Sequence, residues 1–335
     1  MGINAPQKQF CFAEGTTRNN STDGAFDEWL TIQNPNSHVA NVNITYMLGT
    51  GQNVAKPYSV PAKGRITVDV NSDVGNNQDV SIQLNSDIPV VAERPMYFYY
   101  HNWCAEGHNV MGVSNPAYAW HFAEGYTGVG YEEWITIQNP NNKAANVTIK
   151  YMGDSGMLAV CHHVVGPKSR GTVAVSGTKD VSGDVGHGHN VSADITSDVP
   201  IVAERPMYFD YGINSGKNWT GGSDAMGLLT KSYTYYIAEG CTRSGFDTWY
   251  TMSNPGTEEA SITIKYTLDG GKIVTTKHTI PAQSRISLNI SAETGVGQDV
   301  SGKVVSDHEI IIERPMYFNY HGETGGHVGP GFGTD

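Results

Sequence analysis

Apolar and polar residues alternate along most of this chain, which is the pattern of a β-strand with one buried face. The segment 65–70, with the sequence RITVDV, is typical because every second side chain is apolar. Long stretches with apolar residues at three-to-four spacing, which would indicate amphipathic helices, do not occur in the sequence. The pattern predicts an all-β protein.

Short alternating segments separated by turn residues fill the first third of the chain. The turns are rich in asparagine, glycine and proline, as in Asn34-Pro35-Asn36 and Gly75-Asn76-Asn77. The predicted strands are 9–14, 29–33, 40–48, 54–60, 64–70, 79–86 and 90–100. Up to seven short antiparallel strands in about 100 residues are typical of an immunoglobulin-like β-sandwich.

The same landmarks occur three times along the chain. Each copy begins with Phe-Ala-Glu-Gly or Ile-Ala-Glu-Gly, continues with a tryptophan followed five residues later by Asn-Pro, and ends with Glu-Arg-Pro-Met-Tyr-Phe. The last motif occupies 93–98, 204–209 and 313–318. An arginine (Arg65, Arg170 and Arg285) follows each tryptophan by 36 positions.

A six-residue match in triplicate indicates tandem units that share one fold. We predict three tandem immunoglobulin-like antiparallel β-sandwich domains at 1–117, 118–232 and 233–335. Length differences between the copies fall in polar or glycine-rich segments, at 19–23 and 177–186, where surface loops are expected.

The combined pattern FAEG…EW(L/I)TIQNP…ERPMYF resembles an uncharacterised β-sandwich repeat of secreted and envelope-associated bacterial proteins. The resemblance covers nearly the whole chain. It implies an extracellular or cell-envelope accessory module, and it implies no activity and no catalytic residues. The third copy departs from the pattern with Ile237 and Tyr250, which remain hydrophobic.

The net charge of the chain disfavours one class of partner, nucleic acid. With 21 Lys and Arg against 33 Asp and Glu, the net charge is −12, which repels a polyanion, so nucleic acid is not an expected partner. No apolar run approaches the roughly 18 residues that span a bilayer, so we expect no membrane span. The polar segment 1–9 lacks an apolar signal region, so any signal peptide was removed or lies outside this sequence.

A charged residue recurs on an apolar strand face in each copy. Arg94 alternates with Val90, Ala92, Met96 and Phe98, and an arginine buried there requires a carboxylate. The glutamate of the first motif recurs once per copy on an equally apolar strand. We therefore predict structural ion pairs that join the first and last strands of each copy: Glu14–Arg94, Glu124–Arg205 and Glu239–Arg314. A ligand pocket built around the same charges is the alternative.

Aromatic residues lie on the more polar faces of two strands. Trp29 alternates with Thr31 and Gln33, and Tyr97 shares a face with Glu93. Sugar rings stack on such exposed aromatic side chains. The candidate ligand-binding residues are Trp29, Tyr97, Trp134, Tyr208, Trp249 and Tyr317. The alternative is that the tryptophans pack under loops or against the adjacent copy.

The four cysteines contain no CxxC pair. Cys11 and Cys104 both lie in the first copy without counterparts elsewhere, so a disulfide between them and two free buried thiols are both open. Cys161 and Cys241 are expected to be free. The segment 69–75 approximates a calcium loop, but its glycine is one place late and position twelve is Val80, so a turn at a strand end is the simpler interpretation. We expect no metal and no cofactor.

No catalytic motif such as GxSxG, HExxH or a P-loop occurs in the sequence. The carboxylate pairs 27–28 and 132–133 become Asp247-Thr248 in the third copy, and adjacent strand residues point to opposite faces. We therefore predict a non-catalytic spacer, surface-display or adhesion module whose partners are extracellular or cell-surface polysaccharide or protein. A carbohydrate-binding module attached to a secreted enzyme is the alternative. Self-assembly through matching ends and an active site at a junction between copies also stay open.

Overall fold

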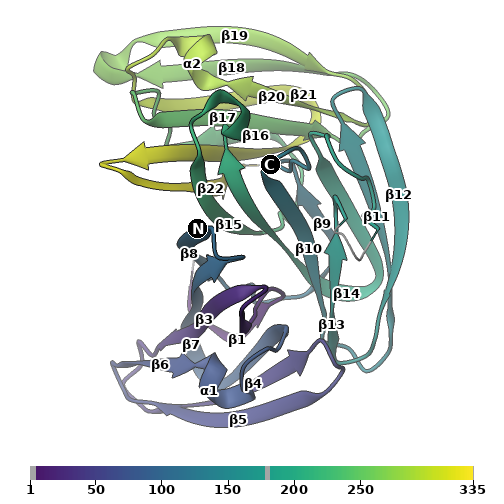
Figure 1. The fold of residues 1–335 in the computed structure, drawn as a ribbon, viewed down its shortest axis with the longest axis vertical. Helices are drawn as coiled ribbons and strands as arrows, with labels where there is room; N and C mark the ends of the chain where they lie inside the picture. The colour runs from purple at the N-terminus through teal and green to yellow at the C-terminus, as the bar shows by residue number, and fades with distance from the viewer. Residues whose placement is uncertain (1–4, 178–181, 335) are drawn as a thin grey trace.

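The computed structural model describes residues 5–177 and 182–334, and antiparallel strands dominate it (Figure 1). The strands form three groups that follow one another along the chain, which we call unit 1 (β1 to β8), unit 2 (β9 to β15) and unit 3 (β16 to β23). The predicted class, three tandem immunoglobulin-like antiparallel β-sandwiches, is confirmed.

The elements have the following bounds. Unit 1 contains β1 (Gln7–Phe12), β2 (Asn19–Asn20), β3 (Gly24–Gln33), β4 (Ala40–Leu48), β5 (Asn53–Val60), β6 (Arg65–Asp69), α1 (Val70–Val74), β7 (Val80–Tyr100) and β8 (Cys104–Met111). Unit 2 contains β9 (Ala117–Phe122), β10 (Tyr131–Asn139), β11 (Ala145–Gly153), β12 (Gly156–Val165), β13 (Ser169–Ala174), β14 (Ser192–Tyr211), the 3₁₀ turn η1 (Ile213–Ser215) and β15 (Trp219–Met226). Unit 3 contains β16 (Ser232–Ile237), β17 (Phe246–Asn254), β18 (Ala260–Leu268), η2 (Asp269–Gly271), β19 (Ile273–Ile280), β20 (Ser284–Asn289), α2 (Ile290–Thr294), β21 (Val300–Tyr320), β22 (Glu323–Pro330) and β23 (Phe332–Gly333).

One long strand belongs to both layers of each sandwich. In unit 1 the first part of β7, residues 80–86, pairs with β1 and β4, and β5 extends that layer. The second part, residues 91–100, pairs with β3 and β8, and β6 extends this second layer from β3. The sequence predicted two separate strands here, but β7 runs through both of them. β14 and β21 have the same role in units 2 and 3.

The segment that approximates a calcium loop is a single helical turn, α1, at the end of β6. The Asp69 side chain caps it by accepting a hydrogen bond from the Ser72 backbone N–H. Asp73 accepts hydrogen bonds from the hydroxyl groups of Tyr46 and Tyr58. Neither α1 nor α2, the two five-residue α-helices of the described residues, has the length and apolar character of a membrane span.

Each unit has a hydrophobic core of its own, and further apolar clusters lie where units meet. One cluster brings Phe26, Phe98 and Tyr100 of unit 1 against Tyr208 of unit 2. Another brings Phe209 and other residues of unit 2 against Tyr317 and Val328 of unit 3. The units are therefore packed against one another and are not separated by linkers.

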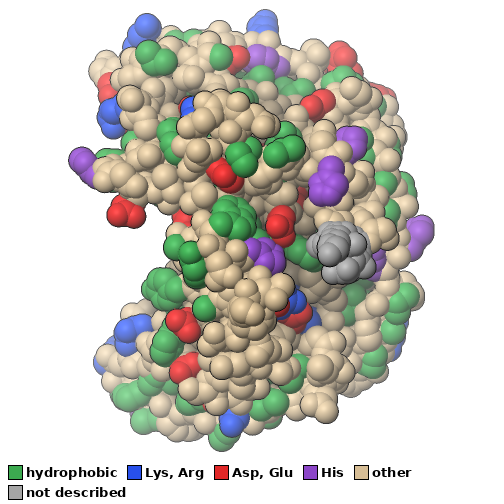
Figure 2. Space-filling view, viewed as in Figure 1, with side chains coloured by type: hydrophobic (Ala, Val, Ile, Leu, Met, Phe, Trp, Pro, Cys, Tyr) green, Lys and Arg blue, Asp and Glu red, His purple; other side chains and the backbone are tan. Residues whose placement is uncertain are grey.

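The three units follow one another around the strands β8, β15 and β22. Figure 1 shows unit 1 at the bottom, unit 2 at the right and unit 3 at the top, with the left side open, and Figure 2 shows a notch on that side. β15 lies against both β8 and β22. The carboxylate of Glu106 on β8 accepts hydrogen bonds from the backbone N–H groups of Gly222 and Gly326, so one side chain links all three units.

All four cysteines are free thiols, so the candidate Cys11–Cys104 disulfide is not formed. Cys104 pairs with Tyr100 at one end of β8, whereas Cys11 bridges to Val113 beyond the other end. The extended chain from Cys104 to Val113 spans about 30 Å. A disulfide tolerates a Cα separation of only about 7 Å. The two thiols lie in different apolar clusters instead.

Candidate functional site

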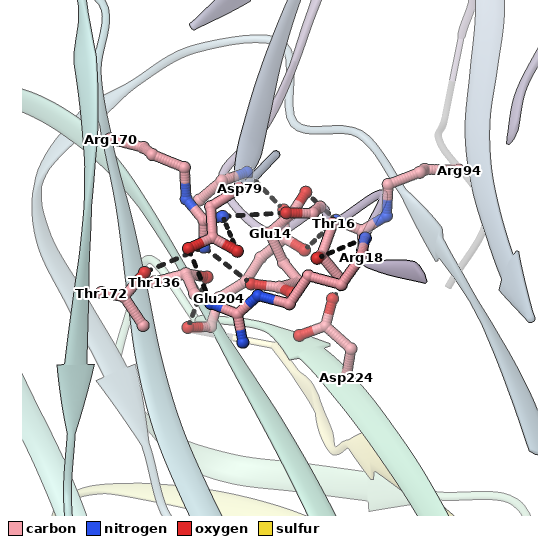
Figure 3. Close-up of polar contacts among 12 residues, drawn as sticks. Glu14, Thr16, Arg18, Asp79, Arg94, Thr136, Arg170, Thr172, Glu204 and Asp224 are labelled. Atoms are coloured by element: carbon pink, nitrogen blue, oxygen red, sulfur yellow. Dashed lines mark hydrogen bonds and ion pairs between the residues drawn. The ribbon is translucent and has the colours of Figure 1, made fainter. Parts of the chain in front are cut away.

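Fully buried ion pairs lie at the junctions between units. At the first junction Arg94 is completely buried, with its Nη1 atom 3.1 Å from Oε2 of Glu204. Its Nη2 atom pairs with Asp224, and Nη1 also donates to the backbone carbonyl of Glu14. Both carboxylates belong to unit 2. Figure 3 shows these groups with the second ion pair of the junction, Glu14 with Arg170.

The second ion pair runs in the opposite direction across the junction. Arg170 of unit 2 places Nη2 3.2 Å from Oε2 of Glu14, and its Nη1 donates to the Gly15 carbonyl at 2.8 Å. The Ala13 backbone N–H donates to Oε1 of Glu204 at 2.7 Å. The Ala-Glu-Gly segment of unit 1 is therefore bound by charged side chains of unit 2.

The junction between units 2 and 3 repeats this arrangement. Arg205 lies 2.9 Å from Glu313, and Arg285 lies 3.3 Å from Glu124. The Ala123 backbone N–H donates to the Glu313 carboxylate at 2.7 Å. The same contacts at two junctions indicate that the repeated motifs encode an interface between neighbours.

The predicted ion pairs within each copy are therefore wrong. Arg94 and Arg205 bind the backbone carbonyls of Glu14 and Glu124, not their carboxylates. The carboxylate partners of both arginines lie in the next unit. The cause lies in strand β1: Phe10 and Phe12 point into the core of unit 1, while Cys11 and Ala13 on the other face join the core of unit 2. The motif that ends this strand is thus presented to the neighbour.

The third predicted pair, Glu239–Arg314, is also wrong: within residues 5–177 and 182–334 no ion pair under 4.0 Å involves either residue. Glu239 is exposed, whereas Arg314 is 8% exposed and its Nη1 atom has no hydrogen-bond partner among the residues that the structure describes. Burial lowers the pKa of Arg314, and the more distant charge of Glu239 opposes this only in part.

The buried carboxylates at the junctions hold protons to different extents. Burial raises the pKa of Glu204 well above its ordinary value against the opposing charge of Arg94. Burial acts in the same direction on Asp224, but Arg94 and a hydrogen bond from Glu204 outweigh it and hold the pKa of Asp224 below its ordinary value. We interpret this pair as sharing one proton, with Glu204 protonated and Asp224 ionised beside Arg94.

A further buried glutamate lies behind the Ala-Glu-Gly segment in two of the units. Burial raises the pKa of Glu28 to about 8, although Arg94 partly opposes the shift, and it raises the pKa of the equivalent Glu133 to about 8. A side chain at Gly15 would collide with the Glu28 carboxylate, which explains the glycine of the motif. In unit 3 the position is Thr248, which hydrogen-bonds to the backbone of Cys241.

The candidate aromatic platform is divided by the junctions. Tyr97 is 59% exposed, but its equivalents Tyr208 and Tyr317 are each 5% exposed. Tyr208 stacks on Tyr100 of unit 1, and Tyr317 stacks on Tyr211 of unit 2 with ring centroids 4.1 Å apart.

The three tryptophans are half-buried rather than freely exposed. Trp134 packs against the aromatic cluster of the first junction, and Trp249 donates a hydrogen bond to the Tyr211 hydroxyl at the second. In the described part of the chain, no preceding unit lies beside Trp29. The alternative interpretation, in which the tryptophans pack against the adjacent copy, describes Trp134 and Trp249.

The two junctions differ in the size of the space beside the ion pairs. Beside the second ion-pair network lies a pocket of about 420 Å³, whereas the equivalent space at the first junction measures about 50 Å³. Arg18, which pairs with Asp79 at 2.9 Å, lines the smaller space. The larger pocket is lined by aromatic side chains from two units. They are Tyr126, Tyr131, Tyr211, Trp249 and Tyr317.

Five residues that the sequence did not assign to a site complete the junctions: Glu204, Glu313, Asp224, Arg170 and Arg285. The two arginines could have been found, because an arginine recurs at the same spacing after the tryptophan in every copy. The residues equivalent to Asp224 are Asn109 in unit 1 and Val328 in unit 3. Because this position is not repeated, the repeat pattern did not mark Asp224 as a site residue. Within the described ranges no cluster of histidine, cysteine and carboxylate side chains is arranged to hold a metal ion.

Comparisons with known proteins give only distant structural likenesses. No protein-family model and no curated protein matches the sequence. The structure of Thermotoga maritima 1070 is 17% identical, covers 33% of this chain and 96% of that chain, and has a TM-score of 0.29. The Anabaena sensory rhodopsin transducer is 20% identical, covers 27% of this chain and 97% of its own, and has a TM-score of 0.23. A tetra-tandem repeat of a large adhesion protein is 13% identical over 98% of this chain and 75% of its own, with a TM-score of 0.14.

Proposed function

We propose that this chain is a non-catalytic extracellular or cell-envelope module in which three sandwich units are held as one rigid, curved scaffold for spacing, surface display or adhesion. The observation that carries the proposal is the pair of junctions. Arg94, Glu204 and Asp224 have fully buried side chains, so the Arg94–Asp224 ion pair and the contact of Arg94 with Glu204 hold neighbouring units together and are closed to a substrate. The sequence resemblance supports a location outside the cytoplasm.

Binding and activity measurements on the intact chain test this proposal. We expect the chain to bind fixed cells, an extracellular polysaccharide or a matrix protein without turning over any member of a hydrolase substrate panel. Turnover that persists after rigorous purification and is lost on Glu204→Gln substitution would overturn the non-catalytic assignment.

A carbohydrate-binding function is the second candidate, favoured by the pocket of about 420 Å³ at the second junction. Its aromatic lining offers faces on which pyranose rings stack, and Asn190 and Ser215 add hydrogen-bonding groups. Glu124 and the net charge of −12 disfavour acidic sugars, so neutral oligosaccharides are the fitting class.

The two junctions supply a matched control for this second candidate. On a glycan array, Trp249→Ala should abolish binding, whereas Trp134→Ala, at the closed junction, should retain it. Since Trp249→Ala also removes a junction contact, Val129→Trp provides a second variant: Val129 is 67% exposed at the rim and a larger side chain there fills the pocket. Absence of binding to every glycan would leave only the scaffold function.

A further inference from the structure

Each junction joins two different surfaces. The first, which we call the leaving face, consists of the Ala-Glu motif, the arginine of the Glu-Arg-Pro motif and the tyrosine at the end of the long strand. The second, the entering face, consists of the glutamate and the tyrosine of Glu-Arg-Pro-Met-Tyr and the arginine that follows the tryptophan by 36 positions (Arg65, Arg170 or Arg285). At the first junction the leaving face belongs to unit 1 and the entering face to unit 2.

Unit 3 carries a complete leaving face that nothing covers in the described part of the chain. Ala238 and Glu239 are exposed, whereas Ala13 and Ala123 are both 0% exposed. Tyr320 is 58% exposed, whereas its equivalent Tyr100 is 4% exposed. The Arg314 guanidinium is buried with no carboxylate of the described residues within 4.0 Å, which is a costly state for a charge.

Unit 1 carries the matching entering face. Arg65 is exposed and, among the described residues, hydrogen-bonds only to Thr67. Glu93 accepts a hydrogen bond from Asn109 instead of an arginine. A depression of about 460 Å³ opens between Thr31, Arg65 and Glu93, at the position where units 2 and 3 receive the Ala-Glu motif of the preceding unit.

The two uncovered faces lie on either side of one gap in the arrangement. Figure 1 shows the units following one another around β8, β15 and β22 from the bottom through the right to the top, and the next step falls on the open left side. Figure 2 shows the notch there. A unit placed in this gap meets the leaving face of unit 3 on one side and the entering face of unit 1 on the other.

We infer that this open side is a docking site for one further β-sandwich unit of the same repeat type. Such a unit offers a glutamate to Arg314 and an arginine to Glu239 on one face. On its other face it offers an arginine to Glu93 and an Ala-Glu motif to Arg65. A second copy of the whole chain does not fit, because its next unit would occupy the place of unit 1.

An extended chain tests this inference. Phe332 pairs with β16 at the position where Val113 bridges to β1, so the two residues are equivalent. A copy of residues 117–231 appended after residue 335 therefore begins as far from Phe332 as unit 2 begins from Val113. The extended chain carries Cys161→Ser in both copies of that residue, Tyr97→Cys in unit 1 and Tyr211→Cys in the appended copy. This protein is treated with a short thiol crosslinker. We expect crosslinking about tenfold faster or more than in the same chain with Glu93→Arg, since that change opposes the docked arginine.

Two further results separate failure of docking from failure of the appended unit to fold. Circular dichroism must show the added strand content, and with that established, equal crosslinking rates with and without Glu93→Arg would overturn the inference. In the unextended chain, sedimentation should show a monomer at all concentrations. A concentration-dependent oligomer that Glu93→Arg dissolves would assign the open side to a second copy and would also overturn it.

Discussion

The ring of Tyr100 lies parallel to that of Tyr208 across the first junction, with centroids 3.7 Å apart and an angle of 8° between the planes. Tyr100 ends the long strand of unit 1, and Tyr208 lies in the Glu-Arg-Pro-Met-Tyr motif of unit 2. Tyr97 is the equivalent of Tyr208 in unit 1, yet it is 59% exposed. One motif position therefore has two environments, set by whether a unit precedes it.

This difference predicts opposite outcomes for the same substitution. Tyr208→Ala removes a buried ring from the junction and should lower the free energy of unfolding by about 3 kcal/mol or more. Tyr97→Ala should change it by no more than about 0.5 kcal/mol, because most of that ring already contacts water. Urea unfolding followed by tryptophan fluorescence measures both. Equal losses for the two variants would contradict the assignment of Tyr208 to an interface.

The arginines of the repeated motif should also differ in their contributions. Arg205→Met leaves Glu313 buried without its cation, and we expect a loss of about 3–5 kcal/mol in unfolding free energy. Arg314→Met removes a buried cation that has no carboxylate within 4.0 Å among the described residues, so it should leave the melting temperature unchanged or raise it. Calorimetry of the two variants decides this, and a similar loss in both would show that the ion pairs contribute little.

Much of this architecture could be predicted from the sequence because the signals are local. Alternation and turn residues located the strands, and a buried arginine on the strand of Met96 and Phe98 correctly required a carboxylate. The break between predicted strands at 86–90 was misplaced, because β7 continues through Pro89 as it passes from one layer to the other.

The partners of the arginines could not be predicted, and the reason is the repeat itself. Every copy contains both the glutamate of the first motif and that of Glu-Arg-Pro, so the sequence does not distinguish Glu14 of the same copy from Glu204 of the next copy as the partner of Arg94. The choice depends on how units pack, which is set by many side chains on both surfaces. The pocket at the second junction could not be predicted for a similar reason. Arg18 lines the small space at the first junction, whereas no arginine of the described residues lines the larger pocket at the second.

The cysteines provide a direct chemical test of the fold. In denaturant and without reductant, a thiol reagent should titrate four groups per chain, because all four cysteines are free. In the native protein Cys161 should react first, since it is half-buried, while burial raises the pKa of Cys11 to about 11. A titre of two thiols, restored to four by a reductant, would show that a disulfide forms after all.

The buried glutamates predict how stability depends on pH. Burial raises the pKa of Glu28 and Glu133 from 4.5 to about 8 in the folded protein. Between these values the folded state binds more protons than the unfolded state, so the unfolding free energy falls as pH rises. The contribution of each group is therefore complete below about pH 4.5 and lost as pH passes through about 8.

Replacing both glutamates with neutral isosteres should remove this part of the pH dependence. We expect Glu28→Gln/Glu133→Gln to lose less stability than the unmodified chain between about pH 5 and 8, by a few kcal/mol, because a side chain that does not ionise has no desolvated charge to form. Asp27→Asn, on the exposed face of the same strand, is the matched control and should follow the unmodified chain. Chemical unfolding at several pH values measures the slopes. A double variant with the same slope as the unmodified chain would mean that these carboxyl groups ionise freely and that water reaches the junctions.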